Sequence, residues 1–286
     1  MLAHVKLTDE VKHFGDTSLH AACEGGSLEI VKTLLSKGVD INAVDNIKNT
    51  PLHMASKRGH LQIVKLLHER QANMTAANEL AHTPFSDAIL CGKLNVVKYY
   101  VLKVKVAPRD QEPLFLACKG GHVHMIEYIF RRFNYTTADL LKTNGHGVSP
   151  LMITSTVEAA RYLALKYKVD FNTATLAGKT VLHHAATMGH YSMLEYLVKN
   201  AGVNINAQDA AGWTAIMDGC KANKLKSIEV LKALGADTSI VSKEEGYNLR
   251  QVGETVEDLK IRVYLNCENL DGHEDITFEG RTLGKQ

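Results

Sequence analysis

Apolar residues recur along this chain in short helical blocks, and the blocks return at a nearly constant interval. Leu61, Val64 and Leu67 fall on one face of a predicted helix, as do Met193 and Leu197 later in the chain. A second short helix is predicted before each block, and a polar run rich in Gly, Asp and Asn follows it. The pattern therefore predicts pairs of helices joined by tight turns.

Seven such units align on a Thr, Ser or Glu at their start. The starts are Thr17, Thr50, Thr83, Glu112, Ser149, Thr180 and Thr214, and the spacings are 33, 33, 29, 37, 31 and 34 residues. A period of this size is typical of a stacked array, in which no unit buries both of its faces alone. We therefore expect one continuous core built between neighbouring units.

The start of the second unit carries the clearest local signals. Thr50 suits the position before a helix, and Pro51 suits its first turn, where a missing N–H costs nothing. Leu52 and Ala55 lie on one helix face, and Gly59 is placed to end the helix in a left-handed conformation.

The chain resembles the ankyrin-repeat family over roughly residues 13–240. The resemblance is carried by Thr-Pro-Leu-His at 50–53, Gly-His at 59–60, and Gly-Val-Asp-Ile-Asn-Ala at 38–43. It implies an all-α solenoid of stacked helix-turn-helix units with short β-hairpin fingers. It also implies that His20, His53 and His183 bond to the backbone and lock neighbouring turns.

The units are unequal, and this sets the expected organisation. The fourth unit carries an insertion at 134–148, and in the fifth Leu151-Met-Ile-Thr replaces the usual Leu-His-x-Ala. The predicted segments are an N-terminal cap at 1–16, a solenoid of seven units at 17–240 with a degenerate fourth and fifth, a degenerate capping unit at 241–265, and an acidic tail at 266–286. Thr255 with Asp258 is predicted to form a capping box in the last unit.

The charge of the chain is nearly balanced, at 33 Lys and Arg against 31 Asp and Glu, which does not favour a polyanion such as nucleic acid as partner. The charge is uneven along the sequence, with a basic stretch at 93–132 and an acidic one at 243–286. The five cysteines form no CxxC motif, which is typical of reduced thiols. With no secretory signal and no long apolar run, the sequence predicts a cytoplasmic protein without membrane insertion, and a nuclear location stays open.

Motifs of catalysis are missing from the sequence. It has no GxSxG, no phosphate-binding glycine loop and no HExxH. Cys118, His122 and His124 fall short of a tetrahedral metal set, as do His183 and His184. We therefore expect no enzyme activity, no metal, no cofactor and no small-molecule substrate.

Binding is the function that the resemblance implies, on the concave face formed by finger tips and the ends of the first helices. Residues at those positions are the predicted partner contacts: Phe14, Asn46, Ile47, Asn49, Lys57, Arg58, Glu79, Leu80, His82, Leu90, Arg109, Lys119, His146, Met188, Trp213 and Lys221. Apolar groups ringed by charge favour a protein or peptide partner. Two plainer readings stay open, namely that Trp213 packs on the neighbouring finger and that the basic positions are ordinary solvated surface.

The sequence thus predicts a non-catalytic interaction scaffold or adaptor. The alternative is a permanent structural subunit of a larger multiprotein assembly. The resemblance further implies asparaginyl hydroxylation in the fingers, with Asn42 as the better candidate and Asn206 as the weaker one, whereas the plainer role of these residues is to stabilise the finger.

Overall fold

The computed structural model describes residues 17–106, 111–243, 246–266, 277–278 and 281–282. The chain divides into two compact units, Met1–Val169 and Asp170–Gln286, and each is described by itself. The predicted N-terminal cap with Phe14, and also Arg109, lie outside the described residues.

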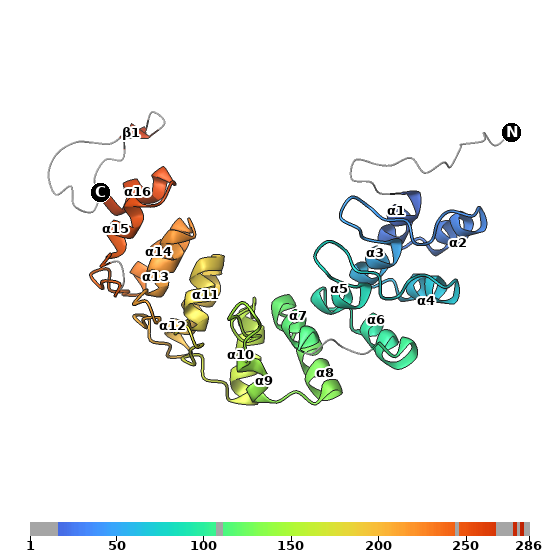
Figure 1. Ribbon diagram of the computed structural model, residues 1–286, viewed down its shortest axis with the longest axis horizontal. Helices are drawn as coiled ribbons and strands as arrows, with labels where there is room; N and C mark the ends of the chain where they lie inside the picture. The colour runs from blue at the N-terminus through green and yellow to red at the C-terminus, as the bar shows by residue number, and fades with distance from the viewer. Residues whose placement is uncertain (1–16, 107–110, 244–245, 267–276, 279–280, 283–286) are drawn as a thin grey trace. The chain divides into compact units, whose positions relative to one another are not determined.

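The first unit contains four helix pairs followed by an irregular end (Figure 1). Its helices are α1 Ser18–Gly25, α2 Leu28–Ser36, α3 Pro51–Arg58, α4 Leu61–Glu69, α5 Pro84–Leu90, α6 Leu94–Tyr99, the π-helical η1 Tyr100–Val104, α7 Glu112–Gly120, α8 Val123–Phe133, α9 Thr137–Leu141 and α10 Val157–Tyr167.

The second unit contains three helix pairs and a short pair of strands. Its elements are α11 Val181–Met188, α12 Tyr191–Lys199, α13 Ala215–Lys221, α14 Leu225–Ala233, α15 Leu249–Glu254, α16 Leu259–Asn266, β1 Thr277–Phe278 and β2 Arg281–Thr282. The two strands pair antiparallel, with Thr277 opposite Thr282. The predicted all-α class is confirmed.

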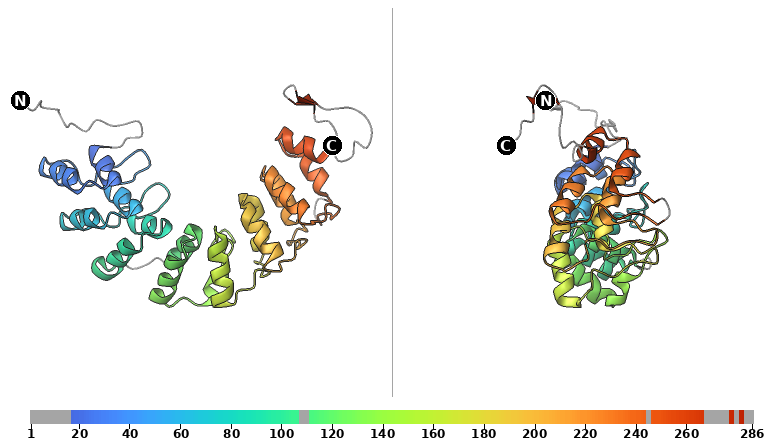
Figure 2. Two further views of the ribbon diagram at one scale, coloured as in Figure 1. Left: turned by 180° about the vertical axis from the view of Figure 1, so that it is seen from behind. Right: turned by 90° about the vertical axis from the view of Figure 1, so that its left-hand side faces the viewer.

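The helices of the first unit form two rows. The first helices of the pairs, α1, α3, α5 and α7, make one row, and the second helices make the other (Figures 1 and 2). Neighbouring first helices pack more closely than neighbouring second helices, so this unit is concave on the side of the first helices. Its core lies between the rows, where the apolar side chains of Leu19, Leu52, Val64 and Leu67 are fully buried.

A histidine in the first turn of three first helices joins each repeat to the next, as the resemblance implied. The Thr50 N–H donates to His53 Nδ1 at 3.0 Å, so the proton of the neutral ring sits on Nε2. That Nε2 donates to the His82 carbonyl at 3.1 Å in the next repeat. His20 and His183 bond in the same way to the carbonyls of Asn49 and Trp213.

The fifth repeat has no first helix. Residues 150–153 form a turn, in which the Ser149 hydroxyl accepts the Met152 N–H and the Thr154 hydroxyl donates to the Pro150 carbonyl. Ile153, Thr154 and Thr156 are β-branched and disfavour a helix here. The Ser155 N–H instead bonds to the Cys118 carbonyl near the end of α7, and α10 then starts after Thr156.

The predicted capping box of the last helix pair is wrong. Asn248 and Gln251 form the box at the start of α15, whereas Thr255 ends that helix and donates its hydroxyl to the Val252 carbonyl at 2.7 Å. Apart from Asn266 at the end of α16 and the strands β1 and β2, the predicted acidic tail lies outside the described residues.

Candidate functional site

Five loops between repeats share one backbone geometry, and we call them the fingers. In each, the N–H of the first residue donates to the carbonyl of the fifth at 2.9–3.0 Å. The fingers are Asp45–Asn49, Asn78–His82, Asn144–Val148, Thr175–Lys179 and Asp209–Trp213. Among the described residues an isolated β-bridge joins Gln208 to Thr214, so the predicted hairpins are tight turns rather than strand ladders.

The first residue of a finger holds the loop shut with its side chain. Asp45 Oδ1 accepts the N–H groups of Ile47 and Asn49 at 2.9 and 2.7 Å. The Asn78 and Asn144 side chains do the same in their own fingers. Asp, Asn or Thr five residues before a repeat start is therefore the sequence signal of a closed finger.

The second and third residues of a finger point outward. Ile47 and Leu80 keep 50% and 70% of their surface exposed, although both are apolar. The tips are neighbours, because the Glu79 N–H donates to the Ile47 carbonyl at 3.0 Å. Asn46, Glu79 and His146 are exposed tip residues as well. These five residues are thus placed where a partner could reach them.

The fifth residue of a finger points inward, and three predicted partner contacts need correction for that reason. Asn49 is buried, donating to Asp45 Oδ2 at 2.9 Å and accepting from Asn78 Nδ2 at 2.8 Å. His82 is largely buried against Asp87, with 3.3 Å between Nδ1 and Oδ1. Trp213 is only 9% exposed, so its side chain is not an exposed partner contact.

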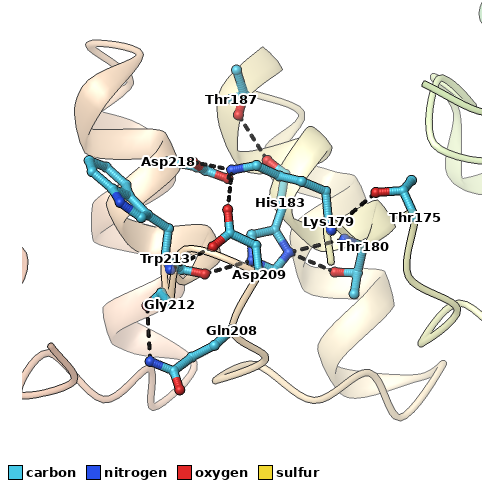
Figure 3. Close-up of polar contacts among 10 residues, drawn as sticks. All are labelled: Thr175, Lys179, Thr180, His183, Thr187, Gln208, Asp209, Gly212, Trp213 and Asp218. Carbon is cyan, nitrogen blue, oxygen red and sulfur yellow. Dashed lines mark hydrogen bonds and ion pairs between the residues drawn. The ribbon is translucent and has the colours of Figure 1, made fainter. Parts of the chain in front are cut away.

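Lys179, the fifth residue of its finger, links two repeats through an ion-pair cluster (Figure 3). Its Nζ lies 2.7 and 2.6 Å from the two carboxylate oxygens of Asp218 on α13 and 2.9 Å from Asp209 Oδ2 in the next finger. Asp209 Oδ1 also accepts the Trp213 N–H at 2.7 Å. Neither of the two partners of Lys179 was predicted from the sequence.

Burial and pairing divide the two carboxylates of this cluster. Burial raises the pKa of Asp218 by more than the Lys179 ammonium lowers it. Burial would also raise the pKa of Asp209, but the bonds from Lys179 and from the Trp213 N–H together lower it. Both carboxylates raise the pKa of Lys179 against the effect of its burial. The cluster joins the finger Thr175–Lys179 to the next finger and to α13.

The C-terminal ends of the first helices carry the charged part of the predicted face. Lys57, Arg58 and Lys119 are exposed, and Arg58 Nη2 pairs with Glu24 Oε1 of the preceding repeat at 2.6 Å. Leu90 is half-buried. Single exposed ion pairs of this kind contribute little to stability, so these side chains are free to serve recognition.

In the second unit the predicted apolar contact Trp213 is buried, and other apolar side chains are exposed instead. Met188 at the end of α11 is exposed, and Leu176 in the finger is completely so. Lys221 is exposed, and its ammonium lies over the Trp213 ring, 4.7 Å from the ring centre, in a cation–π contact.

The two predicted hydroxylation candidates occupy equivalent structural positions. The side-chain oxygen of Asn42 accepts the Asn73 N–H at 2.8 Å, and that of Asn206 accepts the Asp237 N–H at 2.9 Å. Asn172 does the same for Asn204. Each side-chain oxygen thus bridges to the following repeat.

The described residues offer the following for chemistry and for membranes. Burial raises the pKa of the Cys23, Cys118 and Cys220 thiols to about 12, which keeps them protonated and unreactive. Across the described ranges, no three His, Cys, Asp or Glu side chains gather as metal ligands. None of the helices in that part of the chain is both long and apolar enough to cross a membrane.

Comparison with known proteins finds ankyrin repeats in both units. A family model of ankyrin repeats (many copies) matches residues 19–68, and one of ankyrin repeats (3 copies) matches residues 155–242. A putative ankyrin repeat protein of Rickettsia bellii (strain RML369-C) is 36% identical over 70 residues, which are 24% of this chain and 39% of that protein.

A second kind of relative is much longer than this chain. The SMC5-SMC6 complex localization factor protein 1 is 35% identical over 79 residues in Homo sapiens and 25% identical over 83 residues in Bos taurus. These stretches are 28% and 29% of this chain and 8% of each relative. The similarity therefore spans a small part of those proteins.

Proposed function

This chain is an ankyrin-repeat protein, and from that membership we propose that it is a non-catalytic adaptor that binds protein partners through its finger tips and first-helix ends. Ankyrin repeats are protein-interaction repeats.

The observation that carries the proposal is the pair of tips Ile47 and Leu80. Burying apolar side chains normally stabilises a fold, and these two remain in water on adjacent fingers. The fold holds the tips by backbone bonds and does not use these side chains. Exposed neighbouring apolar groups with charged residues close by are typical of protein-binding surfaces.

The test is affinity purification from the native cell, read by quantitative mass spectrometry. We expect Ile47→Ser with Leu80→Ser to lower partner recovery about ten-fold or more, because two apolar anchors are lost. The matched control is Ile30→Ser with Leu102→Ser, since these residues are similarly exposed but lie on α2 and η1 and not in a finger. Equal recovery with the tip variant and the wild type would rule out the tips as the binding surface.

Size-exclusion of native material separates the adaptor from a permanent subunit. An adaptor elutes partly as the free chain, whereas a permanent subunit is found only in the larger assembly.

A further inference from the structure

The helix α7 has an open side, and this follows from the irregular fifth repeat. The helices α1, α3 and α5 each pack against the first helix of the next repeat. After α7 the corresponding residues form the turn at 150–153, so no helix of the fifth repeat covers this side. Asn144 and Gly145 of the finger Asn144–Val148 and residues of α7 line a gap at this side.

The gap is a groove of about 630 Å³, within the size range of binding sites. Phe115 and Leu116 of α7 and Ile153 of the turn supply its apolar surface, and Phe115 and Ile153 are only half-buried. Lys119 lies one helical turn beyond Phe115 on the same face of α7, and Lys142, which follows α9, also lines the groove. Both lysines are exposed.

The carboxylates and the amide near the groove are held in place by neutral donors, and the carboxylates keep their charge. Glu112 Oε1 accepts the Ser86 hydroxyl at 2.6 Å, and Asn144 Oδ1 holds its own finger shut. The Asp139 carboxylate accepts hydrogen bonds from the Thr136 N–H and hydroxyl at 2.7 and 2.8 Å and from the Gln111 side-chain amide. By contrast, neither Lys119 nor Lys142 forms an ion pair within the part of the chain that the structure describes. The residues that line the groove thus carry two lysines against the one carboxylate of Glu112, a net charge of 2 − 1 = +1 beside an apolar floor, while the Asp139 carboxylate lies near Lys142.

We propose that this groove binds an acidic peptide segment of a partner protein, with an apolar side chain on Phe115 and Ile153 and carboxylates toward Lys119 and Lys142. The inference rests on the protein-binding function proposed above and adds a second contact region, distinct from the Ile47 and Leu80 tips. The charge of the rim selects acidic sequences, and the apolar floor favours a peptide over a nucleic acid.

The experiment selects peptides from a random displayed library on the full chain and measures a selected, labelled peptide by fluorescence polarisation. The enriched peptides are expected to carry Asp or Glu flanking a large apolar residue. Lys119→Glu with Lys142→Glu should weaken the selected peptide about ten-fold or more, because two attractions become repulsions. Both residues lie on the surface, so the fold is retained, which circular dichroism checks.

The matched control is Lys37→Glu with Lys103→Glu, which changes the net charge equally at exposed sites away from the groove. Its dissociation constant should stay within about two-fold of the wild type. Equal losses in both double variants, enrichment of peptides without acidic residues, no enrichment at all, or displacement by a single-stranded oligonucleotide would each overturn the inference. The proposed function is read separately, because the purification with the Ile47 and Leu80 variants leaves the groove intact.

Discussion

The fourth residue of a finger lies in the left-handed region, which costs an ordinary residue roughly 1–2 kcal/mol. Three of the five fingers have glycine there, while Lys48 and Ala81 adopt φ values of 61° and 58°. Ala81→Gly should therefore raise the free energy of unfolding by about 0.5–1 kcal/mol. Urea unfolding measures it. Ala77→Gly is the control, because Ala77 is outside the left-handed region and should give no gain.

Histidine protonation should make the fold sensitive to acid. Burial lowers the pKa of His53 and His183 below 6.5, and their networks need a ring Nδ1 that accepts a hydrogen bond. Burial also lowers the pKa of His122, His184 and His190. Below pH 6.5 these histidines bind protons in the unfolded chain but stay neutral in the folded chain. The free energy of unfolding therefore decreases as the pH falls below 6.5.

Urea unfolding at about pH 7.5 and about pH 5.5 measures this effect. His53→Gln should be less stable at the higher pH but should lose less on acidification, since one of the buried rings is gone. Equal stability of the wild type at both values would show that the buried rings do not control it.

At the scale of elements, neighbouring fingers are joined by side chains that differ from repeat to repeat. The Lys179 cluster is the charged version of this joint, and Asn49 with Asn78 is the neutral one. Lys179→Met should lower the free energy of unfolding by about 2–3 kcal/mol, because Asp218 would stay buried without its cation. Adding Asp218→Asn should recover part of this loss. If the double variant is no more stable than Lys179→Met, the unpaired carboxylate is not the cause.

The sequence predicted the repeated helix pairs well, but it did not predict the direction in which individual side chains point. Period and capping residues predicted the helix pairs, because local propensity and stacking agree there. They did not predict that Asn49, His82 and Trp213 turn inward, since this depends on a finger closure that Asp45, Asn78 and Asp209 set up four residues earlier. The groove beside α7 was missed because it comes from a helix that does not form.

At the scale of the whole molecule, the chain divides into two compact units. Trp213 is the only tryptophan and lies in the second unit, so its fluorescence reports on that unit alone. Lys179→Met should lower the urea midpoint seen by fluorescence, whereas Ala81→Gly in the first unit should leave it unchanged. A shift of the fluorescence midpoint by Ala81→Gly would mean that the two units unfold together.

The outward-pointing side chains of a finger contribute little to the stability of the fold. Backbone bonds and the inward first and fifth residues hold the loop, so the side chains at positions such as Ile47, Leu80 and His146 can be exchanged at little cost in stability. A lineage carrying this chain could change partners through single substitutions at the tips without first acquiring a compensating mutation elsewhere. The same property makes the tips the natural place to graft a new specificity onto the existing stack.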